Sequence, residues 1–162
     1  MPIHRLVRTQ LVPRPRREVF AFFEDARNLE AITPATLRFR VLTPAPIDMR
    51  PGTLIDYRLS LLGVPFGWRT LIEAYQPDER FVDVQLAGPY ARWHHTHTFE
   101  HAPGGTLMRD EVEYALPLGW LGDLLAGWLV RRQVEAIFDH RRQVIARRFG
   151  AAPPGEATPS AA

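Results

Sequence analysis

Two histidines and an aspartate near the end of the chain could carry out acid–base chemistry. His95 and His97 are two residues apart in one strand-like segment, and Asp110 lies in the next segment. Residues two apart in a β-strand point to the same face of the sheet, and histidine has the side-chain pKa nearest to neutral pH. A histidine beside a carboxylate can move a proton on a bound molecule, so His97 and Asp110 are the candidate catalytic pair.

The loop between these two segments decides which residues face each other. A four-residue loop over residues 102–105 places His97 opposite Asp110, with Cβ atoms about 5 Å apart. A tighter loop of Gly104 and Gly105 alone would place Asp110 opposite Phe99. Both registers keep these side chains on one face, because odd positions of the first strand match even positions of the second.

Other residues are predicted to surround this pair. Asp83 and Gln85 alternate on one face of the preceding strand-like segment, although they could equally cap turns or bond across strands. Arg141 lies on the apolar side of the last predicted helix and suits either a salt bridge or an acidic ligand. The aromatic candidates would be core or cavity wall. The candidate ligand-binding residues are Tyr57, Trp68, Asp83, Gln85, Trp93, His95, His97, Asp110, Tyr114, Trp128 and Arg141.

The histidines have simpler interpretations as well. They could lie on a solvent-exposed face of the sheet. Alternatively, an interior histidine could pair with a carboxylate and stabilise the sheet. Two histidines with a carboxylate opposite also resemble a two-His-one-carboxylate metal site. Because interior histidine–carboxylate pairs are common, the sequence analysis predicts no metal and no other cofactor.

Composition excludes several chemistries. The chain has 162 residues and no cysteine, and its 20 basic residues are all arginine. Disulfides, thiolate chemistry and a Schiff-base lysine are therefore absent. The lone Ser60 lacks the glycine context of a nucleophile elbow. A net charge of +2 with scattered arginines gives no reason to expect a nucleic-acid partner.

Strand and turn signals alternate through the middle of the chain. Regular strands separated by proline and glycine turns predict an antiparallel meander. A proline precedes the first short helix, and Thr33-Pro34 stops the second. The predicted strands cover residues 3–12, 37–42, 53–62, 67–76, 80–86, 91–101 and 106–116, with a loop over 63–66 and short helices at residues 18–23 and 26–31.

A long amphipathic helix is predicted over residues 117–149. Its apolar residues recur in steps of three and four, which predicts one face on the core and an arginine-rich face in water. The stretch from Gly119 to Val130 is apolar all round but too short to cross a bilayer. We therefore expect it to be buried on both sides or to border a cavity. The apolar positions are Leu121, Leu124, Leu125, Trp128, Val134, Ile137, Phe138, Val144, Ile145 and Phe149.

The ends of the chain suggest one domain with a tail. The N-terminus enters a strand pattern without an apolar signal stretch, so the cytoplasm is the expected location. Residues 150–162 hold small residues and prolines without periodicity, which predicts disorder. Residues 1–149 are expected to form a single domain.

Local motifs along almost the whole chain resemble the SRPBCC superfamily, which includes START lipid-transfer domains, polyketide cyclases and birch-pollen-type (Bet v 1-like) allergens. The likeness is greatest to its bacterial ligand-binding branch. It implies an α+β helix-grip fold, in which a curved antiparallel sheet of about seven strands wraps a long C-terminal helix, with two short helices after the first strand. The motifs are Val19-Phe20-Ala21-Phe22-Phe23, Asn28-Leu29, Thr33-Pro34, Phe81-Val82-Asp83-Val84-Gln85, Gly88-Pro89, Trp93 through Phe99, Gly105-Thr106 with Asp110, Val112 and Tyr114, Leu116-Pro117-Leu118-Gly119, and Ile137-Phe138 with Arg141.

The resemblance implies a hydrophobic or amphipathic pocket between sheet and helix but no single reaction. Three hypotheses remain open. The first is a carrier or sensor for a hydrophobic small molecule such as a lipid, isoprenoid or polyketide. The second is a cyclase or dehydratase that uses a His-Asp pair for proton transfer. The third is an accessory protein whose segment 119–130 docks on a membrane or on an epimerase-like partner. The oligomeric state is not predicted.

Overall fold

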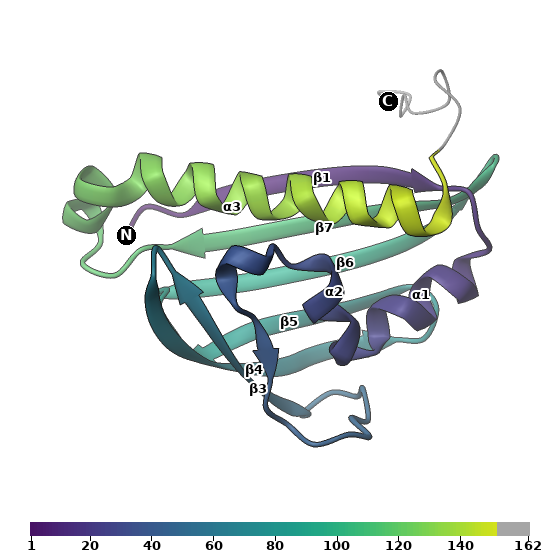
Figure 1. The fold of residues 1–162 in the computed structure, drawn as a ribbon, viewed down its shortest axis with the longest axis horizontal. Helices are drawn as coiled ribbons and strands as arrows, with labels where there is room; N and C mark the ends of the chain where they lie inside the picture. Colours follow the sequence, from purple (N-terminus) through teal and green to yellow (C-terminus); the bar gives the residue numbers. More distant parts are fainter. Residues whose placement is uncertain (152–162) are drawn as a thin grey trace.

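The computed structural model describes residues 1–151 and has one antiparallel sheet with a long helix lying along it (Figure 1). The predicted disorder of residues 150–162 falls, apart from Gly150 and Ala151, outside the described residues. The elements are β1 (His4–Val12), α1 (Arg16–Glu24), the 3₁₀ turn η1 (Ala26–Asn28), α2 (Leu29–Ile32), the 3₁₀ turn η2 (Ala35–Leu37), β2 (Arg40–Val41), β3 (Leu54–Leu61), β4 (Val64–Gln76), β5 (Arg80–Ala87), β6 (Arg92–Ala102), β7 (Gly105–Ala115) and α3 (Trp120–Phe149).

The sheet confirms the predicted fold class. Its strand order is β1-β7-β6-β5-β4-β3-β2, and every neighbouring pair is antiparallel. The register between β4 and β5 shifts at Arg69/Thr70 and again at Ile72/Ala74. Such bulges bend a strand and increase its twist, and the sheet curls so that β3 and β4 lie on the side of the molecule opposite α3 (Figure 1).

The predicted register of the last hairpin is confirmed, because His97 pairs with Asp110. The ladder runs one pair further than expected, to Ala102 and Gly105, so the loop is only Pro103 and Gly104. Gly105 cannot be replaced easily, since a Cβ atom there would collide with the backbone oxygen of Val12. This close approach fixes the start of β7 against the end of β1.

Two predicted strand boundaries are wrong. The strand expected at residues 37–42 is reduced to β2, because the 3₁₀ turn η2 follows Pro34 and Arg38 is left-handed, with φ 46°. The expected loop over residues 63–66 is mostly strand: Leu62 and Gly63, with φ 51° and 80°, form the whole turn, as two-residue hairpins require. Pro65 fits in β4 because β5 pairs with β4 only from Arg69 onward.

Helix α3 buries its apolar face only from Val134 onward. Ile145 and Phe149 pack with the phenylalanines of α1, while Val134 and Phe138 pack with residues of β1 and β7. The first turns of α3 extend past the end of the sheet (Figure 1). The expectation that residues 119–130 are doubly buried or border a cavity is therefore wrong. Most of their large apolar side chains, with that of the preceding turn, are 42–76% exposed, while Leu129 and Val130 are half-buried. The exposed residues are Leu118, Trp120, Leu121, Leu124, Leu125 and Trp128.

Hydropathy gives no reason to place α3 across a membrane. No helix within residues 1–151 combines the length and the apolar character that a bilayer span requires.

Truncating a buried side chain of α3 should destabilise the protein far more than truncating an exposed one. Ile145 has 0% exposure and Leu124 has 70%. Ile145→Ala should lower the free energy of unfolding by about 2–5 kcal/mol, and Leu124→Ala should change it by less than about 0.5 kcal/mol. Urea denaturation of both variants measures this difference; equal losses would contradict the packing of α3 described here.

Candidate functional site

A cavity of about 150 Å³ lies between the inner face of the sheet, the short helices and α3. Its walls are mostly apolar, and one wall carries charged side chains. An apolar chamber with a few convergent polar groups is the usual form of a small-molecule site. The lining residues are Phe23, Ala26, Leu29, Thr33, Leu37, Phe39, Met49, Ile55, Tyr57, Leu59, Leu61, Trp68, Thr70, Ile72, Phe81, Asp83, Tyr90, Trp93, His95, His97, Ile137, Phe138 and Arg141.

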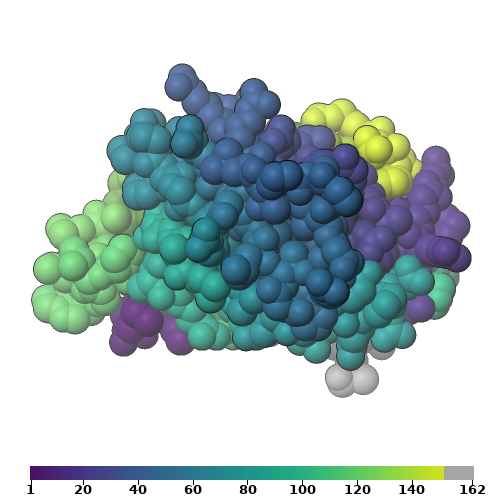
Figure 2. Space-filling model, turned by 90° about the horizontal axis from the view of Figure 1, so that it is seen from below, coloured from purple at the N-terminus to yellow at the C-terminus, as the bar shows by residue number. Residues whose placement is uncertain are grey.

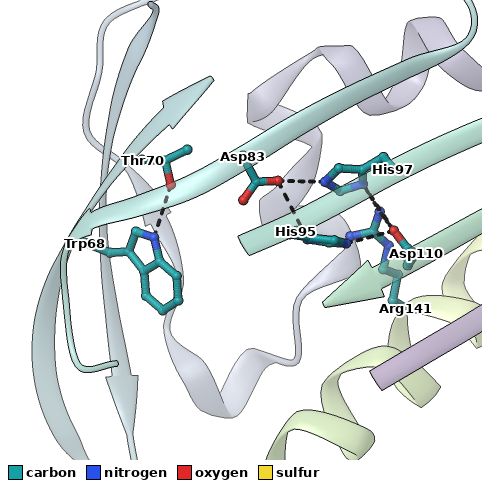
Figure 3. Close-up of polar contacts among 7 residues, drawn as sticks. All are labelled: Trp68, Thr70, Asp83, His95, His97, Asp110 and Arg141. Carbon is teal, nitrogen blue, oxygen red and sulfur yellow. Dashed lines mark hydrogen bonds and ion pairs between the residues drawn. The ribbon is translucent and has the colours of Figure 1, made fainter. Parts of the chain in front are cut away.

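The polar wall is built on three neighbouring strands (Figure 3). Asp83 comes from β5, His95 and His97 from β6, and Asp110 from β7. His97 Nε2 lies 2.7 Å from Asp83 Oδ2, and its Nδ1 lies 3.1 Å from Asp110 Oδ1. His95 Nε2 lies 3.0 Å from the same Asp110 oxygen. Both imidazoles are thus oriented by one carboxylate behind them.

Helix α3 contributes the cation of this cluster. Arg141 Nη2 donates a 3.1 Å hydrogen bond to Asp110 Oδ1 and lies 3.2 Å from His97 Nδ1. The guanidinium also lies over the Phe23 ring, 4.9 Å from its centroid. Arg141 is 5% exposed, and its Nε has no hydrogen-bond partner. The predicted salt bridge of Arg141 is therefore present, and the same side chain lines the cavity.

Burial and mutual charge shift the pKa values of the cluster. Burial opposes ionisation of Asp110, but Arg141 and the hydrogen bonds from the two histidines outweigh it and hold its pKa well below the ordinary value. Burial also opposes ionisation of Asp83, yet His95 and His97 lower its pKa. Burial, with the neighbouring His97, lowers the pKa of His95 to about 4. Burial disfavours charged His97, but the two carboxylates raise its pKa.

The two histidines are therefore chemically different. His97 has a carboxylate at each nitrogen, so neither nitrogen is free for a bound molecule unless Asp83 moves. His95 is neutral near pH 7, and its Nδ1 has only Asp83 Oδ2 nearby, at 3.6 Å, beyond normal hydrogen-bond distance. The assignment of His97 and Asp110 as a catalytic pair stays a prediction.

The predicted site residues divide into two groups. Tyr57, Trp68, Asp83, Trp93, His95, His97 and Arg141 line the cavity. Asp110 does not line it but lies directly behind both histidines, 3% exposed. Gln85 lies outside the lining and closes the β5–β6 turn, with its Nε2 donating to the Tyr90 carbonyl at 2.7 Å.

Two further predicted residues are not in the cavity lining. Tyr114 faces inward as expected and is 3% exposed, but its ring stacks on His4 near the start of α3. Trp128, expected as core or cavity wall, is 64% exposed on α3 beyond the sheet. Trp128 lies six residues before the buried Val134, about 120° away around the helix, so it lies off the face that α3 buries.

Most of the apolar residues that line the cavity were not among the predicted site residues. Ile55, Ile72, Phe81 and Phe138 all lie within the described cavity wall. Alternation along β3 and β4 would have placed Ile55 and Ile72 on the inner face, together with Tyr57 and Thr70. The lining residues that α2 and η2 contribute could not be identified from a repeating pattern, because such short elements contain too few residues to show which face is buried.

Comparison with known proteins gives the family. Residues 12–138 match the model of the family described as polyketide cyclase / dehydrase and lipid transport. This match covers more than half of the chain, so the chain belongs to that family and to the SRPBCC superfamily. Membership of this family supports a fold with a hydrophobic cavity that binds a ligand. Assignment to the narrower bacterial ligand-binding branch stays a prediction. No curated protein sequence matches the chain.

Solved structures with the same fold come from several organisms. Protein CV1439 from Chromobacterium violaceum is 15% identical with a TM-score of 0.68, covering 94% of this chain and all of its own. A START superfamily protein from Mycobacterium smegmatis is 14% identical with a TM-score of 0.64, covering 90% and 97%. Ginseng major latex-like protein 151 from Panax ginseng is 11% identical with a TM-score of 0.63, covering 93% and 99%. At such identities these likenesses show the fold alone.

Replacing the buried Arg141 should lower the free energy of unfolding far more than replacing its exposed neighbour Arg142. Arg141→Leu would leave the Asp110 charge buried without its cation, which should lower the free energy of unfolding by about 3–5 kcal/mol. Arg142 is exposed, so Arg142→Leu should change it by less than about 0.5 kcal/mol. Thermal and urea unfolding measure both. Adding Asp110→Asn to Arg141→Leu should recover part of the loss, and an additive double mutant would contradict this pairing.

Proposed function

We propose that the cavity binds a compact apolar molecule carrying one oxygen-containing polar group, and that the protein acts as a carrier or sensor of it. The observation that carries this proposal is the combination of apolar walls with one polar wall of Asp83, His95, His97 and Arg141. Apolar walls supply affinity, and a small number of polar groups fix the orientation of the ligand.

The size of the cavity narrows the class of ligand. Its volume of about 150 Å³ is below the roughly 300–1,000 Å³ of pockets for drug-sized ligands. An apolar cavity of this volume can hold a molecule the size of benzene. A one- or two-ring compound or a short isoprenoid therefore fits better than a long acyl chain, which would require α2 and η2 to move away from β3.

The polar wall favours a hydroxyl group on that ligand. In the neutral His95 ring, Nε2–H donates to Asp110 Oδ1. This leaves His95 Nδ1 as an unprotonated acceptor. Burial and the nearby Asp83 charge raise the pKa of Tyr57, so its phenol stays protonated at the same cavity. A ligand hydroxyl could donate to His95, and an apolar ligand would leave that acceptor unsatisfied.

A bulky side chain in the lining should block binding. Thr33 lines the cavity and Thr36, three residues away, is exposed outside it. Thr33→Trp should weaken binding of 2-naphthol by at least about tenfold, because the indole takes up space that the ligand needs, and Thr36→Trp should bind like the wild-type protein. Calorimetry on protein kept in a metal chelator measures the affinities.

Two outcomes of this experiment would overturn the proposal. One is the absence of 2-naphthol binding to the wild-type protein at millimolar concentration; the other is equal binding by both variants. Weaker binding of naphthalene than of 2-naphthol is expected, since only the naphthol has a hydroxyl for the polar wall. Native mass spectrometry of freshly purified wild-type protein should also show a co-purified small molecule that Thr33→Trp lacks.

A second candidate function is reversible attachment to an anionic membrane surface, as would suit delivery of an apolar cargo. It is favoured by the apolar patch at the start of α3, formed by Leu118, Trp120, Leu121, Leu124, Leu125 and Trp128. The light green atoms of this segment protrude at one end of the molecule (Figure 2). A contiguous exposed patch of this kind is characteristic of an interaction surface.

Charge at the edge of the apolar patch favours anionic lipid over other occupants. Arg131 and Arg132 follow Trp128 by three and four residues, so they continue its helix face, and all three line one shallow hollow. Two acidic side chains lie near these arginines: Asp123 is paired with His4, and Glu135 lines a neighbouring hollow with Arg131. Tryptophan beside arginine is the composition found where helices lie in the headgroup region.

Sedimentation with lipid vesicles tests this attachment. The protein should sediment with phosphatidylglycerol vesicles, less so at high salt, and not with phosphatidylcholine vesicles. Leu124→Ser combined with Trp128→Ser should reduce the bound fraction at least about fivefold, because it removes apolar area from the patch. The control is Leu62→Ser with Leu86→Ser, two exposed apolar residues elsewhere. Equal binding by both double variants would refute the attachment.

A further inference from the structure

The polar wall of the cavity has the donor set of a metal site. One potential ligand atom from each of Asp83, His95 and His97 lies within 4.8 Å of the other two. Asp83 Oδ2 is 2.7 Å from His97 Nε2 and 3.6 Å from His95 Nδ1. Donor atoms that share a metal at 2.0–2.2 Å lie about 3.0–3.4 Å apart. The two Asp83 spacings lie on either side of that range, and the two histidine nitrogens lie within 4.8 Å of each other.

The groups behind the histidines are those that orient metal ligands. A metal-bound histidine usually donates its second ring N–H to a carboxylate or carbonyl, which fixes the ring and its tautomer. His95 Nε2 and His97 Nδ1 lie 3.0 and 3.1 Å from Asp110 Oδ1, and Arg141 holds this oxygen at 3.1 Å. Asp110 therefore directs His95 Nδ1 and His97 Nε2 together toward Asp83 and the cavity (Figure 3).

The charges of the cluster do not oppose a cation beside Asp83. With both histidines neutral, two carboxylates and one guanidinium leave an excess negative charge among buried groups. Burying an uncompensated charge is costly. A divalent cation bound between Asp83 and the two neutral histidines would more than offset that charge.

We propose that His95 Nδ1, His97 Nε2 and a carboxylate oxygen of Asp83 bind one divalent transition-metal ion, Zn²⁺ or Fe²⁺, with its open coordination positions facing the cavity. Two histidines and one carboxylate on one side of the ion, with positions left free, is a set that suits these metals. An oxygen atom of a ligand in the apolar part of the cavity could then reach the ion. This site does not depend on the identity of that ligand.

Metal titration of the chelator-treated full-length chain, without any organic ligand, tests the proposal. Calorimetry should find one Zn²⁺ per chain, and Co²⁺ should give the visible absorption bands of a site with nitrogen ligands. His95→Ala and Asp83→Asn should each weaken Zn²⁺ binding at least about tenfold and abolish the Co²⁺ bands, because each removes a ligand. Asp110→Asn should weaken binding by about 10–100-fold, as loss of an orienting carboxylate does.

The neighbouring histidine provides the matched control. His94 is adjacent to His95 on the same strand but pairs with Glu73 on the other face. His94→Ala should leave Zn²⁺ affinity and the Co²⁺ spectrum unchanged. Absence of binding by folded wild-type protein, or unchanged binding by Asp83→Asn and His95→Ala, would overturn the proposal, as would loss of binding in His94→Ala. Failure here leaves 2-naphthol binding in the chelator intact, so the two proposals fail separately.

Discussion

The structure depends on one buried oxygen atom, Asp110 Oδ1, which lies within 3.0–3.1 Å of nitrogen atoms from His95, His97 and Arg141. These partners belong to β6 and α3, so one carboxylate ties the centre of the sheet to the helix that covers it. Removing Arg141 would leave the Asp110 charge buried without its cation. The cluster therefore sets the position of α3 over the sheet as well as the chemistry of the cavity.

The cavity exists because the middle and the C-terminal end of α3 have different surroundings. Near Ile145 and Phe149 the helix packs on the phenylalanines of α1, which leaves little space. Near Ile137 and Arg141 it borders the cavity, and the curled strands β3 and β4 form the far wall. The bulges of β4 increase this curl. The sheet is thus closed tightly at one end and held open in the middle, where the polar residues are.

Strand periodicity explains why the cluster was predictable. The alternation in β6 and β7 puts His95, His97 and Asp110 on one face with either the two-residue or the four-residue loop. Asp83 was harder to place, because β5 and β6 are joined by a turn whose length the sequence states less clearly. Trp128 was misplaced because the apolar steps of three and four before residue 130 fall beside the helix face that Val134, Phe138 and Ile145 bury. The cavity lining from α2 and η2 has no period from which it could be inferred.

The pairing of β1 with β7 has a consequence for synthesis of the protein. His4 of β1 pairs with Tyr114, more than a hundred residues later, and Arg141 lies later still. While the chain emerges from the ribosome, β1 has no strand partner and Asp110 has no cation. Contacts between such distant segments form slowly, and domains emerge from the N-terminus. The N-terminal strand must therefore remain unpaired until β7 is made, and the cavity is closed only when α3, the last helix, docks.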